Sequence, residues 1–329
     1  MPILPRFRPG AGFTLLICLA TTVARAEAPS TEAGVREFQA QHYPAARALL
    51  EAAVREDASD ARAAGFLGRV FFEENESERA IPWLEKASAL DSKNPEYPYW
   101  LGRSLGQQAI GASMFTRASL AGRIRRAFQR SVDLDPDNLD ARIGLLEFYL
   151  RAPAFMGGSF AHAKSEAEQV RRRDRLRGHR AMARLYEQQK HWEEAAAEYR
   201  KAIVEFPSSR EPYFWMSRSA MDRKDWDAAF RGMDRLLELF PRDAVPLYET
   251  GRIASLSGRQ LGRGEDCLRR YIAGPTPKDP EPSLALAHAR LAQIAERRGD
   301  RETARRESHE ALRLDPGILE ARETWSRVR

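Results

Sequence analysis

The stretch ARAAGFLGRVFFEENESERAIPWLEKASAL, residues 61–90, decides the fold of this chain. Its apolar residues follow helical rather than strand periodicity, and the small residues Gly68 and Ala80 stand where two helices of one hairpin would cross. Gly68 lies 34 residues after Gly34 and 34 residues before Gly102. A fixed period of this length predicts stacked helical hairpins, because each hairpin buries its apolar face only against its neighbours.

The same spacing continues through the second half of the chain. Pro207, Pro241 and Pro275 are 34 residues apart, and so are Ala195 and Ala229. Proline cannot continue a helix beyond its first turn, so each of these prolines directs the chain into the next hairpin. The pattern therefore predicts an all-α chain built from one repeated unit.

The recurring residues resemble those of the tetratricopeptide repeat family, whose pattern has Leu-Gly at positions 7 and 8, Ala at 20 and 27, and Pro at 32. Three repeats match it well, with Leu67, Gly68, Phe71, Ala80, Leu84 and Ala87 in one, Tyr213, Met216, Ala229, Met233 and Pro241 in another, and Tyr186, Ala195, Tyr199, Ala202 and Pro207 in the one before it. The resemblance implies a right-handed superhelical solenoid of about eight helix-turn-helix repeats. It also implies a function in binding proteins rather than in catalysis.

The repeats can be placed along the chain by this register. They begin near residues 27, 61, 95, 139, 176, 210, 244 and 285. Residues 27–277 then hold repeats one to seven, residues 278–284 a stiff proline-rich joint, and residues 285–329 the eighth repeat with a C-terminal capping helix. Repeat seven departs most from the pattern, because Arg263 and Arg270 fall on both of its small-residue positions.

Residues 1–26 have the features of a secretory signal peptide. Arg6 and Arg8 provide a basic start, residues 11–23 are apolar, and Ala24-Arg25-Ala26 forms a small-x-small cleavage site. The alternative is an uncleaved anchor, but the apolar stretch is short for a membrane span. We therefore expect cleavage after Ala26.

Cleavage would change both the charge and the cysteine content of the chain. The formal net charge falls from +6 to +3, because three arginines and no acid leave, so the basic balance gives little support for nucleic-acid binding. Cys18 does not fit lipid attachment, since bulky Ile17 precedes it, and its loss leaves Cys267 without a disulfide partner. We expect an exported protein, most simply periplasmic, that does not span the membrane.

Two insertions lengthen the hairpins of repeats three and four. Residues near 106–120 add ten residues with helical spacing, and residues 151–159 add about five as a loop rich in Pro and Gly. Both fall between the first and second helix of a hairpin, so we expect them to project side by side from one edge of the solenoid. The side chains expected at that edge are those of Met114, Phe115, Phe155 and Met156. Length drift in surface loops is the alternative.

Arginine recurs on one face of the first helices. Position 9 of the repeat holds arginine in five of eight repeats, namely Arg69, Arg103, Arg184, Arg218 and Arg252. One turn earlier on the same face, position 5 holds Tyr99, Phe214 and Tyr248. In the family these positions line the concave groove, so the resemblance implies a surface of cations and aromatic rings. Such a surface suits a protein or an extended acidic peptide.

The arginines have an alternative role within the fold. Each of them would instead pair with a Glu or Asp on a neighbouring helix, an arrangement that is common and individually weak. The chaperone-tail clamps of the family also use asparagines, which have no match here, so that ligand is not transferred. Another basic run, Arg171-Arg172-Arg173, is expected on the outward face of a second helix and in solvent.

The sequence shows no pattern for catalysis, a metal site or a cofactor. Gly102-Arg103-Ser104-Leu105-Gly106 matches G-x-S-x-G, but that motif works on a strand-turn-helix, whereas this run falls within a first helix. The six histidines have no metal-ligand spacing, and there is no phosphate-binding glycine loop. We expect a non-enzymatic scaffold that binds proteins or peptides in the bacterial cell envelope. A scaffold associated with polysaccharide or peptidoglycan is the alternative.

Overall fold

The computed structural model describes residues 31–275 and 282–329. These residues form 17 α-helices and one short 3₁₀ helix, and no strand is found among them. The predicted all-α fold is therefore confirmed. The predicted signal peptide, residues 1–26, and most of the predicted joint, residues 278–281, lie outside the described residues.

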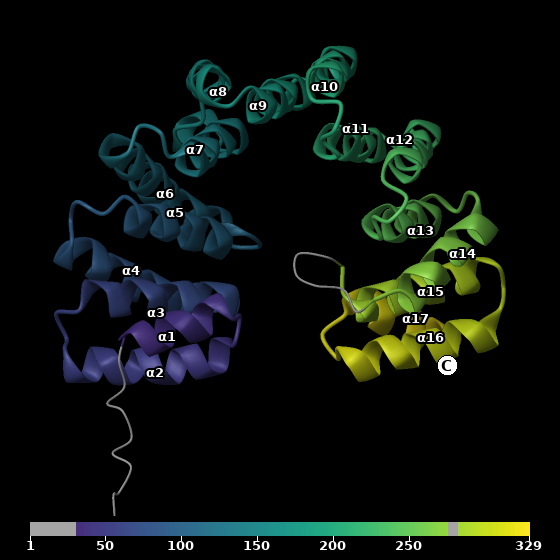
Figure 1. Ribbon diagram of the computed structural model, residues 1–329, viewed down its shortest axis with the longest axis horizontal. Helices are drawn as coiled ribbons and strands as arrows, with labels where there is room; N and C mark the ends of the chain where they lie inside the picture. Colours follow the sequence, from purple (N-terminus) through teal and green to yellow (C-terminus); the bar gives the residue numbers. More distant parts are fainter. Residues whose placement is uncertain (1–30, 276–281) are drawn as a thin grey trace, which may run out of the picture.

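Helices alternate along the chain as the first and second members of hairpins (Figure 1). The first helices are α1 (Thr31–Gln39), α3 (Ala61–Glu73), α5 (Glu96–Ala109), α7 (Leu139–Arg151), α9 (Arg175–Gln188), α11 (Glu211–Asp222), α13 (Val245–Ser257) and α15 (Leu284–Arg297). The second helices are α2 (Tyr43–Glu56), α4 (Ser77–Leu90), α6 (Met114–Leu134), α8 (Phe160–Arg173), α10 (Trp192–Glu205), α12 (Trp226–Leu239), α14 (Leu261–Ala273) and α16 (Arg301–Leu314). A last helix, α17 (Leu319–Val328), packs on both α15 and α16.

Local sequence signals account for where these helices begin and turn. The Asp60 carboxylate accepts a hydrogen bond from the backbone N–H of Ala63 at 2.8 Å, and so caps the free N–H groups at the start of α3. Between the two helices of a hairpin, the backbone adopts a positive φ at one shared repeat position, held by Gln41, Asn75, Lys190, Lys224, Gly258 and Gly299. Repeats three and four, which carry the insertions, turn differently.

Small residues allow the two helices of a hairpin to approach closely. A Cβ atom added to Gly68 would lie 2.6 Å from Cγ of Leu84, and one added to Gly34 would lie 2.6 Å from Cγ of Leu50. In repeat three Gly102 instead meets Phe128, because α6 begins only at Met114 and is 21 residues long. The insertion of repeat three is thus absorbed by a longer second helix.

Repeat seven differs from the register given by the 34-residue period. Gly251 packs against Leu268, whereas the repeat pattern places this large residue one position earlier in the chain. The residue that approaches Ala254 is Gly264, not Arg263. The turn holds one extra residue, and its Gln260 has a positive φ of 49°. The expectation that Arg263 occupies a helix crossing is therefore wrong.

Arg263 and Arg270 both point away from the crossing of repeat seven. The Arg263 guanidinium pairs with Asp234 of α12, and that of Arg270 lies 3.7 Å from Asp266 on its own helix. The residues that α14 buries are instead Gly264, Cys267, Leu268 and Tyr271.

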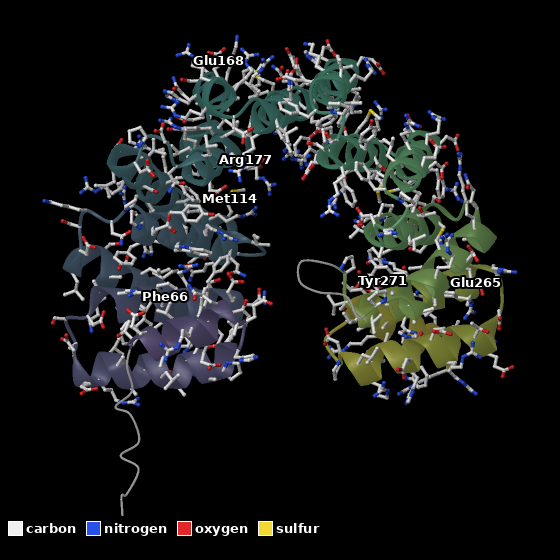
Figure 2. The ribbon with its side chains drawn as sticks, viewed as in Figure 1. Phe66, Met114, Glu168, Arg177, Glu265 and Tyr271 are labelled. Atoms are coloured by element: carbon white, nitrogen blue, oxygen red, sulfur yellow. The ribbon has the colours of Figure 1, made fainter. Side chains whose placement is uncertain are left out.

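The repeats stack into an arch (Figure 1). Most first helices contact the first helix of the next repeat, as α3 does α5 and α5 does α7, whereas second helices pack mainly on adjacent first helices. The first helices are therefore closer together and form the inner side of the curve. Figure 2 shows Glu168 of α8 and Glu265 of α14 on the outer side, and Met114 towards the inner side.

Candidate partner-binding site on the inner face

The five arginines of position 9 all lie on first helices, but their surroundings divide them into two groups. Arg69 and Arg103 belong to α3 and α5, at the N-terminal end of the array. The other three, Arg184, Arg218 and Arg252, belong to α9, α11 and α13. Repeat four, between the groups, carries Glu147 at this position.

Arg69 and Arg103 lie on aromatic rings. Cζ of Arg69 is 4.7 Å from the ring centres of Phe38 and Phe66 and 4.6 Å from that of Trp100, so three successive first helices hold it. Cζ of Arg103 is 4.5 Å from the rings of both Phe72 and Trp100. Such cation–π contacts fix the plane of a guanidinium without neutralising its charge.

Neither of these two arginines has a carboxylate within 4.0 Å among the residues that the structure describes. Nε of Arg69 is buried without a hydrogen-bond partner there. Burial is the main cause that lowers the pKa of the Arg69 guanidinium, which the charges of Glu96 and Glu73 offset only in part. The first two steps of the arginine ladder therefore present positive charge that no direct ion pair among the described residues neutralises.

Arg184 and Arg252 are neutralised within the fold. Arg184 contacts Glu147 of α7 at 3.0 Å and Glu187 of its own helix at 2.9 Å. The hydrogen bond to Glu147 is the main cause that raises the pKa of Arg184. Arg252 contacts Glu249 at 3.0 Å. For these two arginines the structure shows the ion pairing that was the alternative to ligand binding.

Arg218 is the most accessible arginine of the ladder. Its side chain is 55% exposed, and its nearest carboxylate, that of Asp222, is 4.0 Å away. Phe214, one turn earlier, is half-buried against the core of repeats six to eight. This part of the inner face offers one weakly held cation beside one partly accessible ring.

The three position-5 aromatics differ in accessibility. Tyr99 is half-buried between Trp100, at 5.3 Å between ring centres, and Phe128, at 6.3 Å. Tyr248 is only 4% exposed and packs on Tyr271 at 5.6 Å, so little of its ring is open to a ligand. Burial is the main cause that raises its pKa.

The structure brings Tyr99 of position 5 against Arg103, with 5.8 Å between the ring centre and Cζ. The nearer rings that hold Arg69 and Arg103 lie outside positions 5 and 9, so the sequence pattern did not identify them. Phe66 and Phe72 lie three residues before and after Arg69, and Trp100 lies three residues before Arg103. Residues three apart share a helix face, so this spacing was the available signal.

The structure brings the two insertions together. The 3₁₀ helix η1 (Ala154–Met156) of the second insertion lies against α6. Between α5, the start of α6, α7 and η1 there is an open cleft of about 850 Å³, here called the insertion cleft. Met114 and Met156 line it, while Phe115 is 88% and Phe155 is 77% exposed beside them in the chain. The cleft also takes in Arg103 and so joins the inner face.

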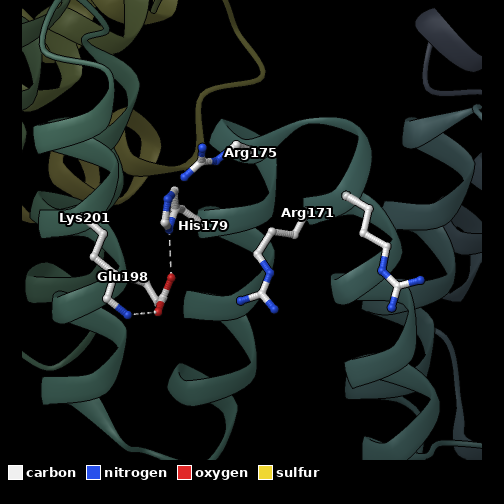
Figure 3. Close-up of a pocket in the computed structure, with 6 residues that line it drawn as sticks. Arg171, Arg175, His179, Glu198 and Lys201 are labelled. Carbon is white, nitrogen blue, oxygen red and sulfur yellow. Dashed lines mark hydrogen bonds and ion pairs between the residues drawn. The ribbon is translucent and has the colours of Figure 1, made fainter.

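A second, basic pocket of about 430 Å³ lies between α8, α9 and α10 (Figure 3). It is lined by Arg171, Arg172, Arg175, His179, Glu198 and Lys201. Glu198 contacts His179 at 2.8 Å and Lys201 at 2.6 Å, and the other ring nitrogen of His179 lies 3.3 Å from Glu205. Burial raises the pKa of Glu198, but the hydrogen bonds from Lys201 and His179 outweigh it, so the pKa is lowered.

This pocket contains a pairing that the sequence pattern did not indicate. The three arginines of the run 171–173 are exposed on the second helix α8, as expected. Arg171 and Arg172 also line the pocket, and Arg173 pairs with Asp137 at 2.7 Å. The His179–Glu198 pair recurs in repeat eight as His288 and Glu307, 2.7 Å apart. In both repeats a polar pair replaces apolar packing at the same repeat positions, four and 23.

The structure offers no nucleophile at the G-x-S-x-G run. Ser104 is fully buried within α5, and its hydroxyl donates a hydrogen bond to the carbonyl oxygen of Trp100 at 2.9 Å. In residues 31–275 and 282–329, no group of three or more His, Cys, Asp or Glu side chains is placed to hold a metal ion. Over the same residues, no helix is long and apolar enough to cross a membrane.

Comparisons with known proteins agree with this architecture. Residues 31–95 match one tetratricopeptide repeat model and residues 176–219 match another. No curated protein matches the chain in sequence.

Two solved structures resemble the chain over most of its length. Yeast Tom70 is 14% identical with a TM-score of 0.66, over 98% of this chain and 66% of that one. A tetratricopeptide repeat protein from Parabacteroides merdae is 13% identical with a TM-score of 0.54, over 90% of this chain and 96% of that one. At these identities the likeness concerns the fold alone. The two matched segments are tetratricopeptide repeats, and the stacked hairpins around them have the same architecture.

Proposed function

We propose that this chain is a non-enzymatic scaffold that binds an extended acidic segment of a partner protein on the inner face of repeats one to three. Tetratricopeptide repeat proteins are in general scaffolds for protein–protein interaction. The observation that supports an acidic segment as the ligand is the pair Arg69 and Arg103, which are held on aromatic rings without a carboxylate partner among the described residues.

The chemistry of this pair favours carboxylates. A guanidinium that is already oriented loses less conformational entropy when it binds, and its edge presents N–H donors in the geometry of a carboxylate. One such contact contributes about 1–3 kcal/mol when it is partly desolvated. Arg184 and Arg252 already pair with Glu147 and Glu249, which leaves Arg218 as the one weakly held cation of the C-terminal part. The proposed site is therefore limited to the N-terminal part of the ladder, where two such arginines are neighbours.

A polysaccharide-binding scaffold is less well supported by the same surface. Sugars stack on the open faces of aromatic side chains, whereas the guanidinium groups of Arg69 and Arg103 already cover rings of Phe66, Phe72 and Trp100.

An esterase is also less well supported, because the fully buried Ser104 gives it no accessible nucleophile.

Export to the periplasm is part of the proposal. It is supported only by the sequence of residues 1–26, with its basic start, apolar stretch and small-x-small site. Cell fractionation of the native host tests it, and recovery of the protein from the cytoplasm with an intact N-terminus would contradict it.

A peptide selection tests the binding function directly. Random 12-residue peptides are selected on the purified protein, and the affinities of the enriched peptides are measured for Arg69→Gln and Arg103→Gln. We expect the peptides to be rich in Asp and Glu, and their affinity to fall roughly tenfold in each of these two variants and to weaken with salt. The charge-matched controls are Arg235→Gln and Arg313→Gln, which are exposed and paired within α12 and α16.

Circular dichroism and urea unfolding establish that the variants are folded. If affinity falls equally in the control pair, or in neither pair, the inner-face proposal is wrong. The run Arg171-Arg172-Arg173 is unsuitable as a control, because two of its members line the basic pocket.

A further inference from the structure

The insertion cleft is built from the two segments that interrupt the repeat pattern. Ile110, Gly111 and Met114 of the first insertion and Pro153 and Met156 of the second line it together. Its volume of about 850 Å³ lies within the usual range for ligand sites in proteins. The lining residues Phe72 and Arg103 connect it directly to the proposed binding face.

Gly106 in the interior of α5 shows that the cleft is not a packing gap that the fold requires. One turn earlier, a Cβ atom on Gly102 would lie 2.9 Å from the ring of Phe128, so that glycine is needed for close packing. A Cβ atom on Gly106 would meet nothing within 4 Å. Glycine within a helix is destabilising relative to alanine, and no contact explains it here. Because residue 106 has no side chain, the wall of the cleft is open at this position.

The lining combines an apolar surface with unpaired positive charge. Ile124, Phe128 and Phe148 supply buried apolar atoms, and Ile110 and Met114 are large apolar residues left exposed to solvent. Clustered exposure of this kind marks interaction sites, because soluble proteins otherwise avoid it.

The charge of the cleft comes from three arginines and one glutamate. Arg103 and Arg117 have no carboxylate within 4.0 Å among the described residues, whereas Arg151 contacts Glu147 at 2.8 Å. Glu147 is shared with Arg184 at 3.0 Å. The one carboxylate that the described residues contribute to the lining is therefore already engaged, and the cleft favours a ligand that brings its own negative charge.

We propose that the insertion cleft takes one large apolar side chain of the bound acidic segment, while carboxylates next to that side chain in the segment pair with Arg103 and Arg117. This inference rests on the proposed function and adds the sequence requirement of the partner, namely a bulky apolar residue flanked by Asp or Glu. Charge complementarity selects this occupant over an uncharged apolar one.

Gly106→Leu fills the cleft from a helix position where the new side chain meets open space. Gly262→Leu is the matched control, because Gly262 lies in α14, also has nothing within 4 Å of an added Cβ, and is remote from the cleft. The probes are synthetic peptides from the selection described above, each with and without its bulky residue replaced by Ala. Fluorescence anisotropy of the labelled peptides with the purified protein gives the dissociation constants.

We expect Gly106→Leu to weaken binding by about tenfold or more, and the Ala-substituted peptides to bind the wild-type protein with a similar loss of affinity. The two changes together should weaken binding little more than either one, because both remove the same interaction. Gly262→Leu should bind as the wild type does.

Three results would overturn the inference. If Gly106→Leu binds like the wild type while Arg69→Gln still weakens binding, the inner-face function stands and the cleft is not the anchor site. If neither change matters, or no peptide is enriched, the proposed function fails as well. If the protein alone is a dimer that Gly106→Leu dissociates, the occupant of the cleft is a second copy of the chain.

Discussion

Replacement of Gly68 by alanine tests the helix crossing on which the fold depends. The new Cβ atom would lie 2.6 Å from Cγ of Leu84 and 3.2 Å from the carbonyl oxygen of Ala80. Leu84 is fully buried, and the carbonyl oxygen belongs to the backbone of α4, so neither atom can move away without displacing its neighbours.

The expected change in the free energy of unfolding is the difference between two opposing effects. Overpacking of this kind costs about 1–3 kcal/mol, whereas alanine in place of glycine in a helix gains about 0.5–1 kcal/mol. We therefore expect Gly68→Ala to lower the free energy of unfolding by roughly 0.5–2 kcal/mol. Gly106→Ala and Gly262→Ala, which meet open space, should keep the gain and unfold at higher urea concentration than the wild type.

Urea unfolding and hydrogen exchange together provide the assay. Stability in a solenoid is shared mainly between neighbouring repeats, so exchange should speed up first in α3, α4 and the helices next to them. The reasoning would be refuted if Gly68→Ala were as stable as Gly106→Ala, or if exchange rose uniformly along the array.

Three further predictions concern other parts of the chain. Ala229→Phe should overpack the fully buried crossing of repeat six, cost roughly 1–3 kcal/mol, and speed hydrogen exchange in repeats five to seven before the rest. The pKa of Glu198 is lower in the folded protein than its ordinary value of 4.5, so the stability it contributes should be present above that pH and lost as the pH falls below it; Glu198→Gln should flatten urea midpoints measured against pH in this acid range. N-terminal sequencing of the exported protein should find Glu27 first, and a product that retains Met1 would contradict the signal-peptide prediction.

The fold was predictable because its cause is periodic and local. Each hairpin repeats the same small and large residues, so Gly34 with Leu50 and Gly68 with Leu84 follow one rule. Repeat seven shows the limit of this reasoning. Counting by a fixed period misses one extra residue in a turn. The positive φ of Gln260 shows where that residue is accommodated, and as a result Gly264 rather than Arg263 lies at the helix crossing.

The candidate site was less predictable, because its character depends on contacts between repeats. The sequence identified arginines at one repeat position, but not that Phe38 of α1 and Trp100 of α5 would both reach Arg69 of α3. It likewise did not show which arginines would find carboxylates. His179 and Glu198 are nineteen residues apart and lie on different helices. The search of the histidines for metal-ligand spacing therefore did not indicate that these two side chains pair.

Glu147 links these observations, since it stands at position 9 of repeat four where five other repeats have arginine. Burial raises the pKa of its carboxyl group, but hydrogen bonds from Arg184 and Arg151 more than offset this, so the pKa is lowered and the group is held as an anion. It therefore neutralises Arg184 of the ladder and Arg151 of the insertion cleft. Arg69, Arg103 and Arg117 remain without such a partner among the described residues, so the positive charge that no direct ion pair neutralises lies in the segment where the cleft opens. An acidic segment bound along the inner face would thus be drawn to repeats two and three, next to the cleft that the two insertions form.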